Sequence, residues 1–337
     1  MKRPVVSKID TGMNKPAKLI DNANIPILGA GPKESAECWK CTDSPCHTFP
    51  KNVLLLPSLQ EIGSVETKPD VCPVDALKID DNGDVIIESN SCIGCGLCLT
   101  NCPVGAIYLE TSSGVGKVNL QPENTGSFDN NILALRDEWA QSIKFAVPTS
   151  AQINKQLELV RAKFFGVKSP KSHLNTRLLV RNSLISLGAN TALRTQGANS
   201  LLSEVVAQEG GRTYLVEIET NDDTLDAFRR LVSSAARAIN SLGVERSALS
   251  LVMIVPQLPN KRVDFYRLVK DARIYLGLRI IVIPFAALIA AVIMRRIGLE
   301  RTFGSFVAEE GKESLSEIAE STFGFRFSET LGLKPSK

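Results

Sequence analysis

The feature that most constrains this chain is a run of four cysteines between residues 92 and 102, with the spacing C-x2-C-x2-C-x3-C followed by proline. The first three thiolates of such a run can reach three corners of one four-iron four-sulfur (4Fe-4S) cubane, while the fourth points to a neighbouring cluster. Gly94 and Gly96 lie between these cysteines, where the backbone must approach sulfur closely and a positive φ is expected. The pattern predicts iron-sulfur cluster binding.

An internal repeat indicates two cluster-binding halves. The segment Cys72-Pro-Val-Asp-Ala-Leu recurs as Cys102-Pro-Val-Gly-Ala-Ile, and all eight cysteines of the 337-residue chain lie in its first third. Between the halves, Asp81-Asn82-Gly83 separates two short apolar runs, which predicts a β-hairpin with an Asn-Gly turn. A zinc site could use two C-x2-C pairs, but zinc would not explain eight cysteines with two Cys-Pro elements.

Over residues 34–110 these motifs resemble those of bacterial two-cluster ferredoxins. The resemblance implies an α+β ferredoxin-like module that holds two 4Fe-4S clusters with crossed ligation. On this basis one cluster would be held by Cys38, Cys41, Cys46 and Cys102, and the other by Cys92, Cys95, Cys98 and Cys72.

The first half departs from the family pattern. Four residues separate Cys41 from Cys46, and twenty-five separate Cys46 from Cys72. His47 follows a predicted ligand, and we consider two interpretations of it. It is an ordinary loop histidine, or it replaces Cys46 or hydrogen-bonds to a cluster sulfide.

The location of the protein is predicted from its polarity. The first nineteen residues are polar and contain proline, which predicts no export signal. A reducing cytoplasm fits a cysteine set that binds metal rather than forming disulfides. The most apolar stretch, residues 280–294, is interrupted by Pro284 and is too short to cross a bilayer in the usual way. We therefore expect a cytoplasmic protein that does not enter a membrane, with a buried strand and helix in this stretch.

The two parts of the chain differ in charge. Residues 34–110 contain twelve Asp or Glu and four Lys, whereas residues 139–194 contain nine basic residues and one Glu. The acidic part is a candidate docking face for a redox partner protein or for the second domain. The basic segment 144–194 is a candidate surface for nucleic acid, and simple surface solvation is an equal alternative.

From Phe128 onward the pattern predicts an α/β domain with a mixed central sheet flanked by helices. We divide the chain into an extension (1–33), the ferredoxin-like domain (34–125), the α/β domain (126–310) and a tail (311–337), and we expect the chain beyond Phe306 to be peripheral. The predicted helices are 132–143, 150–165, 174–187, 225–242, 262–276 and 285–299. The predicted strands lie within 190–220, at 249–255 and at 278–283.

Three carboxylates in this domain form a candidate metal site. Glu217 and Glu219 alternate onto one face of a predicted strand, and Glu204 lies in the neighbouring predicted strand, which contains residues 203–207, across a turn at Gly210-Gly211. If the three converge, they would suit Mg²⁺ or Mn²⁺, which would activate water for attack on a phosphodiester. A hairpin with a solvent-facing acidic row is the alternative.

Residues 174–283 resemble the PD-(D/E)xK fold of restriction endonucleases at these positions. The resemblance implies catalytic and metal-binding roles for Glu204, Glu217 and Glu219, although Glu204 replaces Asp and Glu219 stands where Lys is expected. Arg229, Arg230 and Arg237 on the next helix are candidate phosphate contacts, or simply the helix's solvated side.

These features leave three functions open. The first is a metal-dependent nuclease, or a nucleic-acid-binding protein derived from one, that carries two 4Fe-4S clusters and acts in DNA processing or defence. The second is an electron-transfer subunit of an oxidoreductase complex. The third is a protein whose clusters only stabilise the fold, because metal binding can supply folding free energy.

Overall fold

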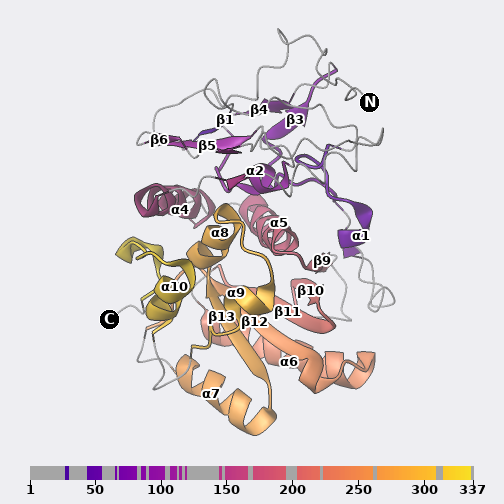
Figure 1. Cartoon of the computed structure of the whole chain (residues 1–337). Coiled ribbons are helices and arrows are strands. Elements are labelled where there is room, and N and C mark those ends of the chain that lie inside the picture. The colour runs from indigo at the N-terminus through magenta and orange to yellow at the C-terminus, as the bar shows by residue number, and fades with distance from the viewer. Residues whose placement is uncertain are drawn as a thin grey trace. The chain divides into compact units, whose positions relative to one another are not determined.

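The computed structural model describes residues 27–29, 44–54, 65–66, 68–81, 85–88, 91–102, 107–111, 114–115, 118–119, 144–145, 149–165, 170–194, 203–220, 223–260, 264–308 and 314–334 (Figure 1). The chain divides into two compact units, Met1–Phe49 with Asp70–Leu159, and Pro50–Pro69 with Val160–Lys337. The predicted helix 132–143 lies outside the described residues. Within them, no helix combines the length and the apolar character that crossing a membrane requires.

The first unit is built from short elements. Strands β3 (Leu77–Ile79) and β4 (Val85–Ile87) pair antiparallel, which confirms the predicted strand pairing, whereas Asn82 and Gly83 of the predicted turn lie outside the described residues. Helix α2 (Leu97–Asn101) carries part of the cysteine run. The remaining elements are β1 (Ile27–Gly29), β5 (Tyr108–Thr111) and β6 (Gly114–Val115) in one sheet, and the pair β7 (Val118–Asn119) and β8 (Lys144–Phe145). Helix α4 (Ser150–Phe165) has the predicted bounds and begins in this unit.

The second unit contains a six-stranded sheet in the order β13-β12-β11-β10-β9-β2. Its strands are β2 (Val65–Glu66), β9 (Asn190–Arg194), β10 (Val205–Glu209), β11 (Arg212–Ile218), β12 (Leu249–Val255) and β13 (Arg279–Pro284). β2, β9, β10 and β11 pair antiparallel, whereas β11, β12 and β13 pair in parallel. The prediction of a mixed sheet is confirmed. The unit also includes the short helix α1 (Lys51–Leu54).

Helices cover both faces of this sheet (Figure 1). On one face, α6 (Thr224–Leu242) meets α7 (Phe265–Leu276), where the rings of Phe228 and Phe265 pack edge to face with centroids 6.4 Å apart. On the other face, α5 (Pro170–Ser186) packs against α8 (Phe285–Ile293). All seven residues of β12 are buried, as expected for a parallel strand covered on both sides.

Local sequence accounts for several element boundaries. Gly210 and Gly211 have φ angles of 57° and 79°, which the tight turn between β10 and β11 requires. α6 begins where the side chain of Asp223 accepts a hydrogen bond from the backbone N–H of Asp226, and it ends at Gly243 with φ 64°. A short 3-10 helix (Arg246–Ala248) then leads into β12.

Two expectations about the last part of the chain are wrong. The helix predicted to reach residue 299 ends at Ile293, because Arg295 adopts a φ of 52°, and a new helix, α9 (Leu299–Phe303), starts after Gly298. The chain beyond Phe306 is not peripheral within residues 314–334. There, α10 (Leu315–Phe323) and a 3-10 helix (Glu329–Leu331) contribute buried side chains.

Aromatic packing and hydrogen bonds hold this last part on the sheet. Phe306 and Phe323 pack with centroids 6.5 Å apart, and Phe327 lies 5.6 Å from Phe323. The backbone N–H of Val282 donates to the carbonyl of Phe306 at 2.7 Å. The segment therefore covers the outer edge of β13, where unpaired backbone groups would otherwise be open to other chains.

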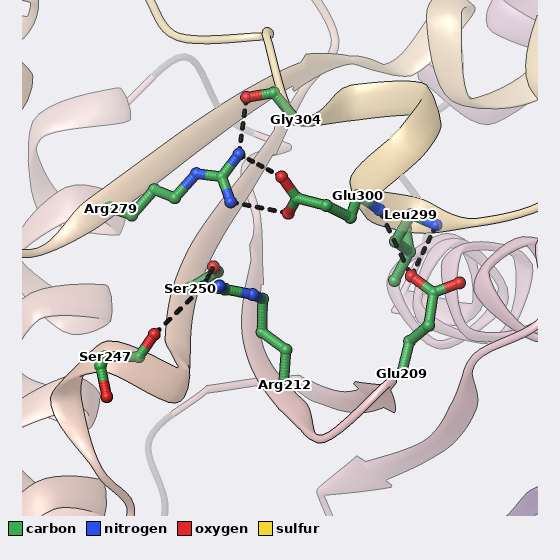
Figure 2. Close-up of polar contacts among 8 residues, drawn as sticks. All are labelled: Glu209, Arg212, Ser247, Ser250, Arg279, Leu299, Glu300 and Gly304. Carbon is green, nitrogen blue, oxygen red and sulfur yellow. Dashed lines mark hydrogen bonds and ion pairs between the residues drawn. The ribbon is translucent and has the colours of Figure 1, made fainter.

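A polar network anchors α9 to the sheet (Figure 2). The carboxylate of Glu209 on β10 accepts hydrogen bonds from the backbone N–H groups of Leu299 at 2.8 Å and Glu300 at 3.3 Å. The guanidinium of Arg279 on β13 donates to both carboxylate oxygens of Glu300 at 2.6 Å and to the carbonyl of Gly304 at 2.8 Å. These groups satisfy one another, so the network supports the fold.

Candidate functional site

The cysteine run occupies a loop followed by one helical turn and a half. Gly94 and Gly96 have φ angles of 66° and 84°, so the positive φ expected at both positions is confirmed. Gly96 caps α2, which carries Cys98 within the helix. The left-handed glycines turn the backbone tightly, and this places successive cysteine side chains on the inside of the loop.

Backbone N–H groups point at the sulfur atoms of Cys72 and Cys92. The N–H of Ala76 donates to Sγ of Cys72 at 3.1 Å, and the N–H of Gly94 approaches Sγ of Cys92 at 3.3 Å. Asp75 adopts a φ of 55°, a conformation that few residues other than glycine accept, and so turns the chain back toward Cys72. Such donors stabilise a thiolate more than a neutral thiol.

Electrostatic coupling shows that several thiols lie together. Burial raises the pKa of Cys95, and the neighbouring Cys72 and Cys92 raise it further. Burial also raises the pKa of Cys98 well above its ordinary value, followed by the charges of Cys92, Cys95, Cys72 and Cys46. Since metal ligation requires thiolates, a cationic group must be supplied to hold these sulfurs ionised together.

The described thiols fit an iron-sulfur cluster. Cys46, Cys72, Cys92, Cys95, Cys98 and Cys102 are all free of disulfides. The last four of these are at most 9% exposed, so a group bound among them is largely shielded from water. Cys38 and Cys41 lie outside the described residues.

His47 lies in the turn that contains Cys46. Its Nδ1 is 2.9 Å from the hydroxyl oxygen of Thr48, and its carbonyl accepts a hydrogen bond from the N–H of Val71 at 2.8 Å. The turn is thereby joined to the segment that leads to Cys72. These contacts favour the interpretation of His47 as an ordinary loop histidine.

The predicted carboxylate site contains an unexpected cation. Glu217, only 1% exposed, forms an ion pair with Nε of Arg230 on α6, and Arg230 also pairs with Asp226. Burial first and then the charge of Glu204 raise the pKa of Glu217 to about 7, although Arg230 opposes this shift. Glu219 is also buried, at 4% exposure. Glu217 therefore faces α6, and neither acid is open to solvent, which corrects the alternative interpretation given above.

This arrangement does not fit the divalent ion predicted from the sequence. Among the residues that the structure describes, no three His, Cys, Asp or Glu side chains are placed to ligate one metal ion, so the convergence expected of Glu204, Glu217 and Glu219 is not seen. A cubane is a different case, because each of its irons takes a single protein thiolate. The guanidinium of Arg230 already pairs with Glu217. Arg230 is thus a partner of this carboxylate and not an open phosphate contact.

Part of the basic segment is also buried or already paired. Arg181 on α5 is fully buried, and its Nε donates to the side chain of Asn182 at 2.8 Å. Arg177 donates to the backbone carbonyl of Arg194, and Arg161 contacts the side chain of Gln257 at 3.4 Å. These arginines hold the unit together, so the segment is not the continuous cationic surface that its composition suggested.

The cysteine segment is the part of the chain that known proteins share. Residues 67–113 match the model of the LdpA Fe-S cluster-binding domain. This is an iron-sulfur, ferredoxin-like segment. It includes Cys72, the β3–β4 hairpin and the complete cysteine run. It does not include Cys46 or the six-stranded sheet of the second unit, which we call the α/β unit.

Curated relatives match less than a third of this chain. An iron-sulfur subunit of formate dehydrogenase from Wolinella succinogenes is 29% identical over 98 residues, which are 29% of this chain and 37% of that protein. Two uncharacterised ferredoxins of Methanocaldococcus jannaschii are 30% identical over 73 residues and 51% identical over 41 residues, or 22% and 12% of this chain. The matches span 33% and 24% of those ferredoxins.

No solved structure matches the chain significantly. The expected restriction-endonuclease-like fold therefore has no support from a structural relative. What is observed is the order α5, β9, β10, β11, α6, β12, with β12 parallel to β11.

Proposed function

We propose that this chain is an electron-transfer protein whose ferredoxin-like domain, residues 34–125, holds two 4Fe-4S clusters. The observation that carries this proposal is the group of disulfide-free cysteines, four of them buried within residues 92–102, with backbone N–H groups directed at the sulfurs of Cys72 and Cys92. A 4Fe-4S cluster takes up and releases single electrons, which is the chemistry that ferredoxins use.

We assign the ligands by the crossed pattern. Cluster two is held by Cys72, Cys92, Cys95 and Cys98, as the resemblance to two-cluster ferredoxins implies. Cluster one is held by Cys38, Cys41, Cys46 and Cys102. The cysteines would bind and orient the clusters. The backbone N–H groups directed at Cys72 and Cys92, together with the limited exposure of cluster two to water, would set the reduction potential of that cluster.

The physiological partner that we propose is a redox protein. The relative from Wolinella is named as the iron-sulfur subunit of formate dehydrogenase, which is a component of an oxidoreductase. The α/β domain, residues 126–310, would then be the part that distinguishes this chain from a free-standing ferredoxin. We propose that it recruits or positions a catalytic subunit.

Anaerobic reconstitution followed by iron and sulfide analysis tests this proposal. The wild type should hold roughly eight irons that dithionite reduces reversibly, whereas Cys95→Ala and Cys46→Ala should each retain roughly four. Electron paramagnetic resonance should show a different surviving cluster in each variant. His47→Ala, one residue from Cys46, is the matched control and should retain both clusters. Clusters that cannot be reduced reversibly would leave only a structural role and refute electron transfer.

A second candidate function is nucleic-acid processing by the α/β domain. It is favoured by the element order from α5 to β12, which agrees with the order of the PD-(D/E)xK resemblance, and by the burial of Glu217 beside Glu204. The ion pair between Glu217 and Arg230 weighs against a working metal site.

Plasmid and single-stranded DNA with Mg²⁺ or Mn²⁺ provide the test of this second function. Cleavage by the cluster-loaded wild type that is lost in Glu217→Gln would establish a nuclease. DNA that stays intact and unbound with both proteins would remove this candidate and leave electron transfer as the function.

A further inference from the structure

The β3–β4 hairpin is joined by hydrogen bonds to two of the cysteine turns. The backbone N–H of Glu88 donates to the carbonyl of Ala76 at 2.8 Å, and the N–H of Ala76 in turn donates to Sγ of Cys72 at 3.1 Å. The N–H of Cys92 donates to the carbonyl of Glu88 at 3.0 Å. The base of the hairpin is therefore in direct contact with the backbone around two of the thiols assigned to cluster two.

The two faces of the hairpin differ. Leu77 and Ile87, which are paired across the strands, are 4% and 8% exposed and belong to the core. On the opposite face, Ile86 lies across from Lys78 and two residues before Glu88, and it is 48% exposed. The outward face of a half-buried antiparallel hairpin is usually polar, so Ile86 is an apolar side chain that would gain free energy if a partner protein covered it.

The charges around Ile86 are mostly negative. Lys78 Nζ lies 2.5 Å from the carboxylate of Glu88, and Asp80 and Asp81 follow β3 toward the tip. One lysine against three carboxylates gives the described hairpin a net charge of +1 − 3 = −2. The outer face is thus an exposed isoleucine with an acidic surround.

We propose that this outer face, formed by Lys78, Asp80, Asp81, Ile86 and Glu88, is the docking surface for a redox protein whose own surface is basic around an apolar contact. The inference rests on the proposed electron-transfer function and adds the partner's chemistry and its place of contact. Opposite charges steer the encounter, and the apolar contact fixes the docked position close to cluster two. A small interface of this kind suits a short-lived electron-transfer encounter.

The test uses cytochrome c, a basic haem protein, as the probe. Cluster-loaded, dithionite-reduced protein is mixed anaerobically with oxidised cytochrome c, and the rate is followed by stopped flow at low and high salt. Asp81→Lys should slow cytochrome c reduction roughly 3- to 10-fold at low salt, and the difference should shrink at high salt, where charges are screened. Ile86→Ser should slow it roughly 2- to 5-fold at both salt concentrations, because the lost contact is apolar.

Two matched variants and a second oxidant serve as controls. Glu245→Lys makes the same charge change on an exposed residue of the α/β unit, and Ile274→Ser removes an isoleucine that is 53% exposed on α7. Both should reduce cytochrome c at the wild-type rate. Ferricyanide, a small anion that needs no docking surface, should be reduced by Asp81→Lys and Ile86→Ser at least as fast as by the wild type.

The outcomes separate the two proposals. Rates with cytochrome c that are unchanged in Asp81→Lys and Ile86→Ser, while ferricyanide is still reduced, would overturn the docking surface and leave electron transfer intact. Equal slowing by Glu245→Lys would also overturn it, because net charge alone would then explain the effect. A loaded wild type that reduces neither oxidant would instead refute electron transfer itself.

Discussion

The cysteine segment and the Glu217 site both bring ionisable side chains together away from water, but they balance the charge differently. At Glu217 the chain supplies its own cation, the guanidinium of Arg230. At Cys95 and Cys98, burial has the largest effect and raises the pKa of both thiols. The charges of other cysteine thiols raise it further. The Glu217 site therefore has a cation from the protein itself, although burial still raises the pKa of Glu217, whereas the thiols need a cationic group from outside.

This difference means that metal binding is much less favourable at Glu217 than at the cysteines. A buried carboxylate with an arginine partner gains little from a divalent ion, because the ion must displace the guanidinium first. Thiols that repel one another when ionised gain the full electrostatic benefit of bound iron. Removing the cationic group at each site, which is bound iron at the cysteines and Arg230 at Glu217, tests this difference.

Removal of iron should have the largest effect. Without the clusters, the turns around Cys72 and Cys92 have little core to hold them, and we expect the segment to become accessible to protease. Limited proteolysis with mass spectrometry should show early cuts within residues 68–102 of the iron-free protein, while β12 stays protected. Equal protection with and without iron would contradict this account, and reconstitution should restore resistance.

Removal of Arg230 should destabilise the α/β unit. Arg230→Met leaves the carboxylate of Glu217 buried without its cation, and we expect the α/β unit to lose about 2 kcal/mol of stability at pH 8. The value is below that for a fully buried pair, since the Arg230 side chain is 41% exposed and its charge is partly screened. Chemical denaturation measures it. Arg229→Met on the same helix is the control, because Arg229 is exposed and its loss should cost under about 0.5 kcal/mol.

The pH dependence of stability should reveal Glu217 directly. Its pKa is raised from 4.5 to about 7 in the folded protein, so the folded state holds a proton that the unfolded state releases between these pH values. Stability from this group is therefore present below about pH 4.5 and is lost as pH rises to about 7, by up to about 3 kcal/mol. Glu217→Gln should remove this slope. Parallel pH profiles for the wild type and Glu217→Gln would refute the shift.

Local patterns predicted the parts of the fold that depend on neighbours in sequence. β12 occupies the predicted residues 249–255 because a continuous apolar run is sufficient for a strand buried on both faces. α6 differs from its prediction by one residue, because its apolar stripe and terminal glycine are both local signals. The cysteine run was equally informative, since four cysteines within eleven residues constrain one another directly.

Contacts between distant residues account for what the sequence did not predict. Arg230 looked like a solvated helix residue, and its pairing with Glu217 depends on α6 packing over β11. The composition of the basic segment 144–194 predicted an exposed cationic surface, but Arg181 is buried in the folded protein. The end of α8 at Ile293 and the docking of the last helices likewise follow from tertiary contacts, for which the periodicity of one segment carries no signal.

Removing the ion pair between Arg279 and Glu300 should cause the smallest loss of stability among these changes. It is bidentate, with both contacts at 2.6 Å, but the side chains are 31% and 47% exposed, so water already solvates much of the charge. We expect Glu300→Gln to cost about 0.5–1 kcal/mol, measured by chemical denaturation. A double-mutant cycle with Arg279→Met isolates the pair from the bond between Arg279 and the carbonyl of Gly304. A loss equal to that of Arg230→Met would mean that burial of Glu217 does not set the energy of its ion pair, and the contrast between exposed and buried charge in this domain would fail.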